Sequence, residues 1–278
     1  MTASEHPEPE PGPPQDFTHA PGLALLAQHP SVLRSAHPHV AHLMTGSLVF
    51  EAEASPETSP EAEAGPGYRE PRILLLRRAP EDSYPLSWEL PGGSVDATDR
   101  SVLHAAAREL WEETGLAARH FRACVGLLPA AAAAGVPSPE AAAWGIPPGR
   151  DADPWEEDWR AFQEADADAD ADADTDTRTD TRTDAGAGTD IKMLAFAETG
   201  ELWAKVTLAV DVRDTGAVRV RPEEHTEFAW VTRREALTGW LDGEDGERRV
   251  LGFLSPAVRS QVLQAFRSRG GRSSSAYE

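Results

Sequence analysis

The chain has 278 residues and a formal net charge of −21, but the whole excess of acid lies in residues 1–20, 51–64 and 151–190. Such acidic segments repel phosphate, so we expect no nucleic-acid partner. The only cysteine, Cys124, excludes an internal disulfide, and no apolar run approaches the ~20 residues that cross a bilayer. A targeting peptide would need basic residues near the N-terminus, but no lysine or arginine precedes Arg34. We therefore expect an intracellular, cytoplasmic protein without a membrane partner.

The first elements expected along the chain are a helix and three strands. Residues 22–35 carry apolar side chains at helical spacing, with Pro30 as a kink or stop. Residues 45–51 and 72–77 are strand-like runs, which we expect to form a hairpin with an enlarged acidic loop. Residues 88–90 read as a short strand that ends at a proline.

The remaining elements alternate between helix and strand without regular βαβ units. They are a helix over 100–114, a strand over 121–128, a hairpin of strands 193–197 and 203–212, a strand over 227–231 and a helix over 255–268. A mixed β-sheet between helices fits this order best, and we predict an α+β fold.

Low-complexity segments set the expected domain organisation. The repeat at 165–189 alternates Ala-Asp, Thr-Asp and Thr-Arg, and it lacks the glycine and terminal glutamate of a calcium-binding loop, so a solvated linker is expected. We therefore predict one domain between two tails and broken by two inserts. The parts are an acidic, Pro-rich tail over 1–20, a domain over 21–270, an acidic loop over 52–67, an insert over 129–190 and a flexible end over 271–278.

Three glutamates on one predicted helix suggest a chemistry. Glu109, Glu112 and Glu113 stand at i, i+3 and i+4, so they form one stripe about 100° wide. Carboxylates this close repel each other, and the helix macrodipole adds a penalty near the C-terminus. The arrangement is explained by a bound cation, and Mg²⁺ prefers oxygen ligands that leave room for substrate phosphates. Such a pattern alone also occurs on solvated helix faces.

The other residues of this helix have simpler interpretations. Ala105 lies one turn before Glu109, and its small side chain would leave space for a ligand. Leu103, Ala107 and Leu110 point to the core, and Gly115 is a candidate left-handed cap.

The stretch from Gly93 to Leu116 resembles the Nudix box, Gly-x5-Glu-x7-Arg-Glu-U-x-Glu-Glu-x-Gly-U, in which U is a bulky aliphatic residue. The run Arg108-Glu109-Leu110-Trp111-Glu112-Glu113-Thr114-Gly115-Leu116 matches its second half completely, and Trp88-Glu89-Leu90-Pro91-Gly92-Gly93 is similar to the family's entry strand. The first half departs from the pattern: Asp99 replaces the glutamate, and eight residues rather than seven precede Arg108. Asp99 is therefore interpreted as a helix N-cap rather than a catalytic contact.

The resemblance implies a Nudix-like α/β/α sandwich and a set of roles. Glu109, Glu112 and Glu113 would bind Mg²⁺, with Mn²⁺ as an alternative, and the Gly93 carbonyl would be a further ligand. Arg108 would orient Glu109 through a charge-assisted hydrogen bond.

The family often takes another carboxylate from a distant loop. Glu224 is the candidate, because it precedes a strand similar to the family's closing Trp-Val strand. Glu223 and Glu227 are rivals, and each could equally be an exposed loop acid. His225 could serve as a base, although a lone loop histidine is more often structural.

The resemblance implies a hydrolase that splits a nucleoside diphosphate linked to another moiety, using Mg²⁺ and water. Its partner would be a small nucleotide-type molecule, and the sequence leaves the oligomeric state open. Two alternatives remain. A binding module without turnover would not need all three glutamates, and an isomerase would need a cysteine or acid at the site, whereas Cys124 reads as a small core residue.

Overall fold

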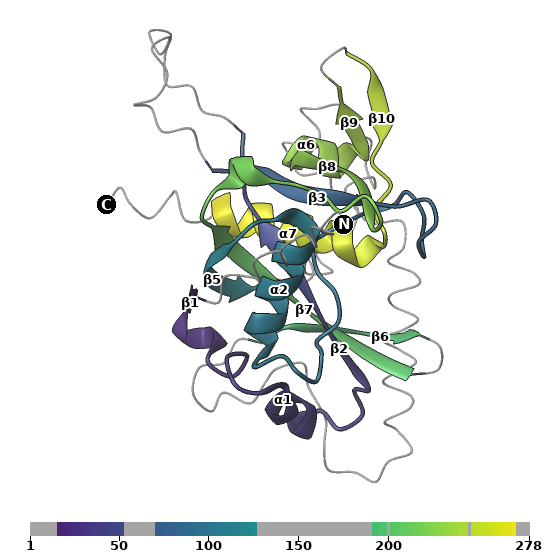
Figure 1. The fold of residues 1–278 in the computed structure, drawn as a ribbon. Helices are drawn as coiled ribbons and strands as arrows, with labels where there is room; N and C mark the ends of the chain where they lie inside the picture. The colour runs from purple at the N-terminus through teal and green to yellow at the C-terminus, as the bar shows by residue number, and fades with distance from the viewer. Residues whose placement is uncertain (1–15, 53–69, 127–190, 199–200, 244–245, 271–278) are drawn as a thin grey trace, which may run out of the picture.

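A computed structural model describes residues 16–52, 70–126, 191–198, 201–243 and 246–270 of the chain (Figure 1). The expected inserts lie almost wholly outside these residues. In chain order, the elements are β1 (Thr18–His19), η1 (Pro21–Leu23), α1 (Pro30–Ala36), β2 (His42–Val49), β3 (Arg72–Arg78), β4 (Trp88–Glu89), α2 (Val102–Thr114), β5 (Ala118–Cys124), β6 (Met193–Glu198), β7 (Glu201–Val212), η3 (Thr215–Ala217), β8 (His225–Thr232), α6 (Arg233–Thr238), β9 (Trp240–Asp242), β10 (Arg248–Val250) and α7 (Pro256–Gly270).

Two sheets form the centre of the molecule. The larger one has the order β1-β5-β7-β2, and β6 also pairs with β7. Its β2–β7 and β1–β5 pairs are parallel, whereas β5 and β6 run antiparallel to β7, so the sheet is mixed. The smaller sheet is antiparallel with the order β4-β3-β8, and β9 and β10 form a separate hairpin. The predicted hairpin of residues 193–197 and 203–212 is confirmed as β6 and β7.

The predicted hairpin of residues 45–51 and 72–77 is wrong. β2 pairs in parallel with β7 along its whole length, and only the bridge between Phe50 and Ile73 joins it to β3. The burial of β2 explains this outcome, because its residues are covered on both faces from Thr45 to Val49. Parallel pairing suits a strand that is buried on both faces, and a long connection does not force strands that are neighbours in sequence to pair.

The predicted helix over 22–35 is two shorter elements, η1 and α1. Pro30 does not kink or stop a helix here; it begins α1, and the side chain of His29 caps that helix by accepting the N–H of Ser31. Proline suits the first helical position because its missing N–H would have no partner there.

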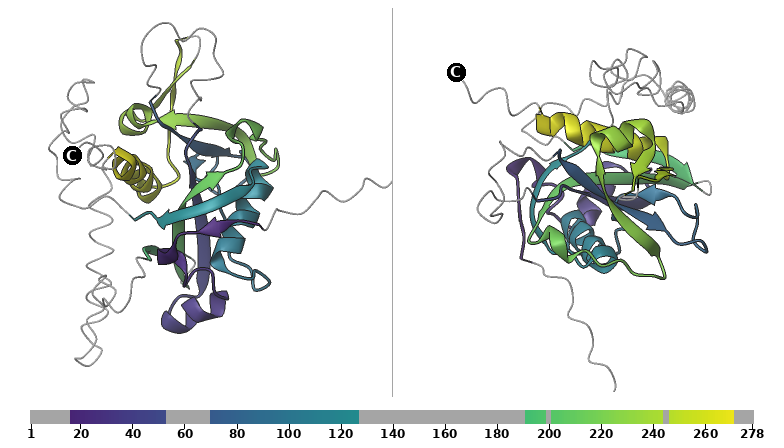
Figure 2. Two further views of the ribbon diagram at one scale, coloured as in Figure 1. Left: turned by 90° about the vertical axis from the view of Figure 1, so that its left-hand side faces the viewer. Right: turned by 90° about the horizontal axis from the view of Figure 1, so that it is seen from above.

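Helices cover both sides of the sheets (Figure 2). One core packs α2 and α1 against β2, β5 and β7, and the other packs α7 and α6 against β3, β4 and β8. β3 contributes to both cores, because Leu74 and Leu76 face the first and Ile73 and Leu75 face the second. The described residues thus form the predicted α+β, Nudix-like α/β/α sandwich.

The loop between β4 and α2 is joined to β2 by backbone hydrogen bonds. The N–H groups of Ser47 and Thr45 donate to the carbonyls of Pro91 (2.7 Å) and Gly93 (2.8 Å), and the N–H of Val95 donates to Leu43 (2.8 Å). This pairing fixes the loop that leads into α2 and therefore positions the acidic stripe. No helix among the described residues is long and apolar enough to span a membrane.

Candidate active site

Helix α2 carries the predicted acidic stripe and begins at a serine cap. The hydroxyl of Ser101 accepts the backbone N–H of His104 at 3.2 Å, so Ser101 rather than Asp99 is the N-cap. Gly115 ends the helix in the left-handed conformation, as predicted, with φ of 69°.

The apolar side of α2 is larger than predicted. Leu103, Ala107 and Leu110 are buried in the core as expected, but Ala105 is also fully buried there. The segment between η1 and α1 contacts the N-terminal end of α2, where the N–H of Leu103 donates to the carbonyl of Leu26. Ala105 therefore leaves no space for a ligand, and this prediction is wrong.

Arg108 is the centre of a dense ionic group. Its guanidinium makes a two-point contact with Asp99, at 3.1 Å to Oδ1 and 3.0 Å to Oδ2. It also donates to Glu109 (2.9 Å), to Glu112 (3.0 Å) and to the carbonyl of Ser94 (2.9 Å). The hydrogen bond to Asp99 is the main reason why the pKa of Arg108 is raised, although burial opposes the shift. Asp99 thus ties the lengthened loop to the helix.

Glu109 reaches the second glycine of the loop. A side chain at position 93 would place its Cβ 2.7 Å from the Glu109 carboxylate, so only glycine lets the two groups come this close. Burial raises the pKa of Glu109, the charges of Glu112 and Asp96 add to the effect, and Arg108 opposes it. The Gly93 carbonyl accepts the Thr45 N–H at 2.8 Å and the Thr45 hydroxyl at 3.5 Å.

Glu113 lies deeper than the other two glutamates of the stripe. Its carboxylate accepts the N–H of Gly92 at 2.6 Å, and its side chain is buried. Burial raises the pKa of Glu113 well above the ordinary value, and the charges of Glu89, Glu109 and Glu224 act in the same direction. The Gly92 hydrogen bond opposes this shift without cancelling it. The ionised form of Glu113 is therefore disfavoured at this buried position.

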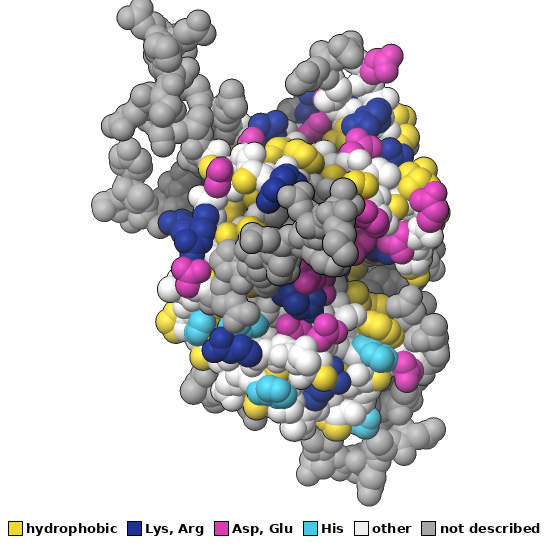
Figure 3. Space-filling model, viewed as in Figure 1, with side chains coloured by type: hydrophobic (Ala, Val, Ile, Leu, Met, Phe, Trp, Pro, Cys, Tyr) yellow, Lys and Arg dark blue, Asp and Glu magenta, His cyan; other side chains and the backbone are white. Residues whose placement is uncertain are grey.

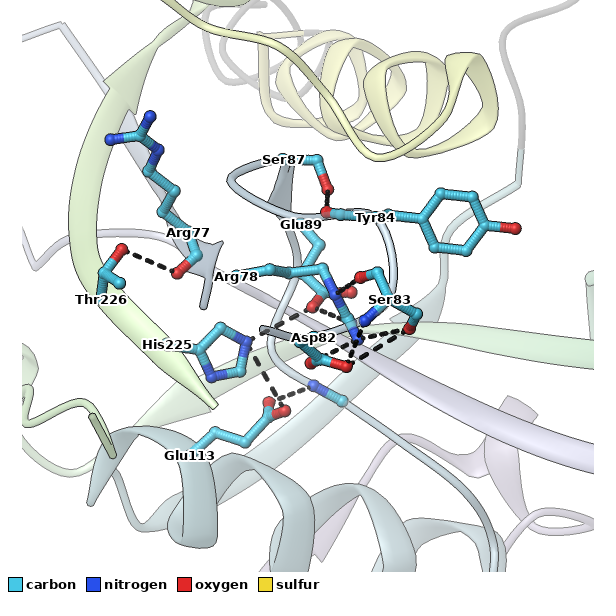
Figure 4. Close-up of polar contacts among 11 residues, drawn as sticks. Arg77, Arg78, Asp82, Ser83, Tyr84, Ser87, Glu89, Glu113, His225 and Thr226 are labelled. Carbon is cyan, nitrogen blue, oxygen red and sulfur yellow. Dashed lines mark hydrogen bonds and ion pairs between the residues drawn. The ribbon is translucent and has the colours of Figure 1, made fainter. Parts of the chain in front are cut away.

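Sequence reasoning missed Glu89, which lies beside His225 and close to the Glu113 site. Glu89 is 4% exposed and accepts a hydrogen bond from Arg78 at 2.5 Å. The Nε2 of His225 lies 3.3 Å from Glu89 and 3.9 Å from Glu113 (Figure 4). Glu89 lies between two buried apolar residues of a short strand, and nothing in that local pattern indicates a buried acid.

Lys205 is a second residue that the sequence analysis did not select. It is 6% exposed and lies in the otherwise apolar centre of β7. Its Cε would lie 2.9 Å from a Cβ at Gly46, so the glycine leaves room for the lysine side chain. Burial lowers the pKa of Lys205 and Arg78 adds to this, while the charges of Glu89 and Glu113 oppose it. The sequence did offer a signal for this residue, because Lys205 is the single lysine in a run of mostly apolar residues.

The structure separates the three candidates for the distant carboxylate. Glu224 is exposed, and one of its oxygens, an oxygen of Glu113 and a nitrogen of His225 lie within 4.8 Å of one another. Glu227 lies on β8 and pairs with Arg77 (2.7 Å) and Arg249 (2.8 Å). Glu223 is exposed on the loop before β8. His225 itself is the first residue of β8 and is buried, so it is not a loop histidine.

A divalent cation fits this set of donors. Glu109 and Glu113 carry raised pKa values because burial and like charges disfavour their ionised forms. A cation held by these carboxylates would remove that penalty, and carboxylate oxygens suit Mg²⁺. In the space-filling view, acidic and basic side chains lie side by side near the middle of the face that carries α2 (Figure 3).

Comparison with known proteins gives a family and a set of similar folds. Residues 66–176 match the family model of the NUDIX domain. No curated protein matches the sequence. Similar solved structures include a MutT protein from Methanosarcina mazei Go1, at 17% identity over 82% of this chain and 94% of that chain, with a TM-score of 0.40.

Two other structures are similar at lower identity. One is an Ap4A hydrolase binary complex from C. elegans, at 12% identity over 82% of this chain and 99% of that chain, with a TM-score of 0.40. The other is the NUDIX domain of Shewanella oneidensis NrtR complexed with ADP ribose, at 12% identity over 82% and 86% of the two chains, with a TM-score of 0.41. The family match spans the loop and helix that carry Gly93, Arg108 and the three glutamates. Residues 66–176 of this chain are thus similar to the NUDIX domain family.

Proposed function

We propose that this protein is a Mg²⁺-dependent pyrophosphohydrolase that cleaves a nucleoside diphosphate linked to another moiety. One observation carries the proposal: Glu113 projects from α2 into a buried position where its ionised form is disfavoured, with Glu224 alongside, while Glu109 keeps a raised pKa although it pairs with Arg108. Arg108 and Gly93 complete the set of residues that the Nudix box predicts for metal binding and orientation.

The charges of the substrate explain why such a site is needed. A diphosphate bridge is shielded from nucleophiles by its own negative oxygens. A divalent ion supplies compensating charge and lowers the pKa of a bound water. The residues of the chain then hold the carboxylates in place and accept the proton of the attacking water. The water oxygen bonds to phosphorus, the bridging bond breaks, and a nucleoside monophosphate and a phosphorylated product leave.

The structure supports distinct tasks for the site residues. Arg108 holds Glu109 and Glu112 in a fixed relation through two hydrogen bonds. The N–H of Gly92 fixes the Glu113 carboxylate, and the backbone of the loop before β8 is held because Ala79 donates to the Glu224 carbonyl at 2.8 Å. We also propose that one domain over residues 21–270 carries this activity, because η1, α1 and α7 all contribute to the two shared cores.

The test is an activity panel with a matched pair of variants. Dinucleotides, nucleotide sugars, CoA and damaged nucleoside triphosphates are assayed with Mg²⁺ and with Mn²⁺. At least one compound should be cleaved at its diphosphate bond, and Glu113→Gln should lower kcat more than about a hundredfold while leaving the circular dichroism spectrum unchanged. Glu227→Gln is the control, because Glu227 pairs with Arg77 and Arg249 rather than with the site.

Two results would overturn the proposal. If Glu113→Gln turned over at the wild-type rate, the metal assignment would be wrong. If no compound were cleaved but nucleotides bound tightly in calorimetry, the chain would be a binding module of the family rather than an enzyme.

A further inference from the structure

Three aromatic rings lie in a row across β2, β7 and β6, which run side by side (Figure 1). His42 is the partner of Trp203 in the β2–β7 pair, and Phe196 is its partner in the β6–β7 pair. The ring centroids of His42 and Trp203 are 4.0 Å apart, with 23° between the planes, and those of Phe196 and Trp203 are 6.3 Å apart, with 19° between the planes. Neighbouring rings are therefore close to parallel, and all three lie on one face of the larger sheet because cross-strand partners share a face.

Two apolar side chains extend this row along the same face. Met44 and Leu194 each lie two residues from one of the rings in their own strand, so they share its face. Both are partners of Lys205 in the sheet. All of these side chains except Lys205 are partly exposed, and among the described residues they belong to neither hydrophobic core. They form a surface that we call the ring patch, which consists of His42, Met44, Leu194, Phe196 and Trp203.

The ring patch begins where the buried part of this face ends, next to the proposed metal site. Gly46 is the next residue of this face along β2, and it is buried. Met44, which precedes it on this face, forms an antiparallel bridge with Ser94. The carbonyl of Ser94 in turn accepts a hydrogen bond from Arg108 at 2.9 Å. The ring patch is therefore continuous with the loop that leads into α2.

Lys205 marks the same border on β7. It is buried, and the charges of Glu89 and Glu113 act on its pKa. Trp203 lies two residues before it, and alternate residues of a strand have Cα atoms about 6.5 Å apart. A diphosphate held at Glu113 would therefore bring the nucleoside attached to it within reach of the ring patch.

We propose that the ring patch binds the aromatic base of the nucleotide substrate. The proposal rests on the proposed function and names the residues that recognise the nucleoside part of the substrate. Flat side chains suit a flat ligand, and every base has a π-face that can stack on an aromatic ring. The base on the ring patch and the diphosphate at the carboxylates would then be held by separate groups of residues.

A base fits the ring patch better than a sugar does. The hydroxyl groups of a sugar need hydrogen-bonding partners when they leave water. On the ring patch, Nε2 of His42 is already paired with Glu201 at 2.7 Å, and the indole nitrogen of Trp203 is buried. The remaining side chains of the patch are apolar, so the surface offers contact area rather than hydrogen bonds.

Saturation-transfer NMR of the full chain with the four ribonucleoside 5′-monophosphates and Mg²⁺ tests the proposal without relying on activity. The base protons of at least one monophosphate should receive more saturation than its ribose protons, because the base lies against the rings. Trp203→Leu should weaken the binding of that monophosphate about tenfold and remove the excess saturation of the base. Trp240→Leu is the control, because Trp240 lies in the separate β9–β10 hairpin, where Arg248 covers its ring at 5.7 Å.

A second variant keeps the test decisive if Trp203→Leu does not fold. Phe196 lies on β6, which pairs only with β7 among the described strands, so Phe196→Leu should fold and should weaken binding in the same direction. Equal saturation of base and ribose in the wild type, or unchanged binding in the variants, would overturn this proposal. It would also fail if none of the four monophosphates bound the wild type. Cleavage in the activity panel decides the proposed function separately, so the two failures are distinguishable.

Discussion

Glu112 and Glu113 are neighbours in sequence, yet α2 places them in opposite surroundings. Glu112 is a third exposed and shares Arg108 with Asp99 and Glu109. Glu113 is buried, accepts the backbone N–H of Gly92, and has a raised pKa because of burial and nearby acids. The protein thus neutralises part of its acidic stripe with an arginine and leaves the deeper part without one, which is the part that the proposed function assigns to a cation.

This difference defines two groups of residues. The outer group consists of Asp99, Arg108, Glu109 and Glu112, and the inner group consists of Glu89, Glu113, Lys205 and His225. The outer group orients carboxylates through ion pairs with one guanidinium. The inner group orients them through burial and close backbone packing, so the two groups should respond differently to substitution, pH and metal.

The largest expected effect comes from the glycine next to the inner group. Gly92 has φ of +150°, and a Cβ there would lie 2.2 Å from the Thr45 carbonyl oxygen. Gly92→Ala should lower the free energy of unfolding by more than about 3 kcal/mol, because a strained backbone and a displaced β2 add together. Urea denaturation measures this loss.

The neighbouring glycine is the matched control for that substitution. A Cβ at Gly93 would meet only the end of the Glu109 side chain, which can rotate away. Gly93→Ala should therefore cost less than about 1 kcal/mol of stability while lowering activity. Equal losses of stability in the two variants would contradict the packing described for β2.

A smaller effect is expected from the arginine of the outer group. Arg108→Met would leave the carboxylate of Asp99, which is 8% exposed, without its two-point partner, and should cost about 1–3 kcal/mol in unfolding free energy. Arg108→Lys keeps the charge but not the planar fork, so it should recover only part of that loss. If neither variant lost stability, the contacts of Arg108 would not hold the loop before α2.

The smallest expected effect has the opposite sign. The pKa of Glu113 is raised above 4.5, so in metal-free protein stability should fall as pH rises from about 4.5 to the raised value and stay level above it. Glu113→Gln removes this penalty and should stabilise the metal-free protein at neutral pH by less than about 2 kcal/mol. Denaturation in EDTA between pH 5 and 8 measures the difference.

Glu112→Gln provides the comparison for the pH experiment, because Glu112 is more exposed and paired with Arg108. It should change stability by less than about 0.5 kcal/mol at every pH. Addition of Mg²⁺ should reverse the order and make the wild type more stable than Glu113→Gln. A flat wild-type profile in EDTA would show that the charge on Glu113 is compensated without metal.

The parts of this molecule that were predictable from sequence carry a local signal. The helix with Leu103 and Leu110 in the core and Gly115 at its end follows from spacing and cap chemistry. The fold class followed from the family resemblance and the order of the elements. The α6 helix was missed, although Thr232 and Glu235 form a capping box that is visible in the sequence.

The unpredicted parts depend on contacts between distant segments. The surroundings of Lys205 follow from the parallel pairing of β2 with β7, which replaced the hairpin predicted for β2. Glu89 and His225 meet because β4 and β8 both pair with β3, and their residue numbers give no hint of this. Ala105 was misjudged because it packs in a core that also takes residues from near the N-terminus, such as Leu26.

Gly46 has a consequence for anyone who builds hybrids of this protein. A Cβ at Gly92 would lie 2.8 Å from the Gly46 Cα, and on Gly46 itself a Cβ would meet Lys205. The missing side chain of Gly46 therefore makes room both for Gly92, from the loop before α2, and for Lys205, from β7. A Nudix box transplanted from another protein would need the β2 and β7 strands that pack against it in that protein. The box, β2 and β7 should therefore be exchanged together.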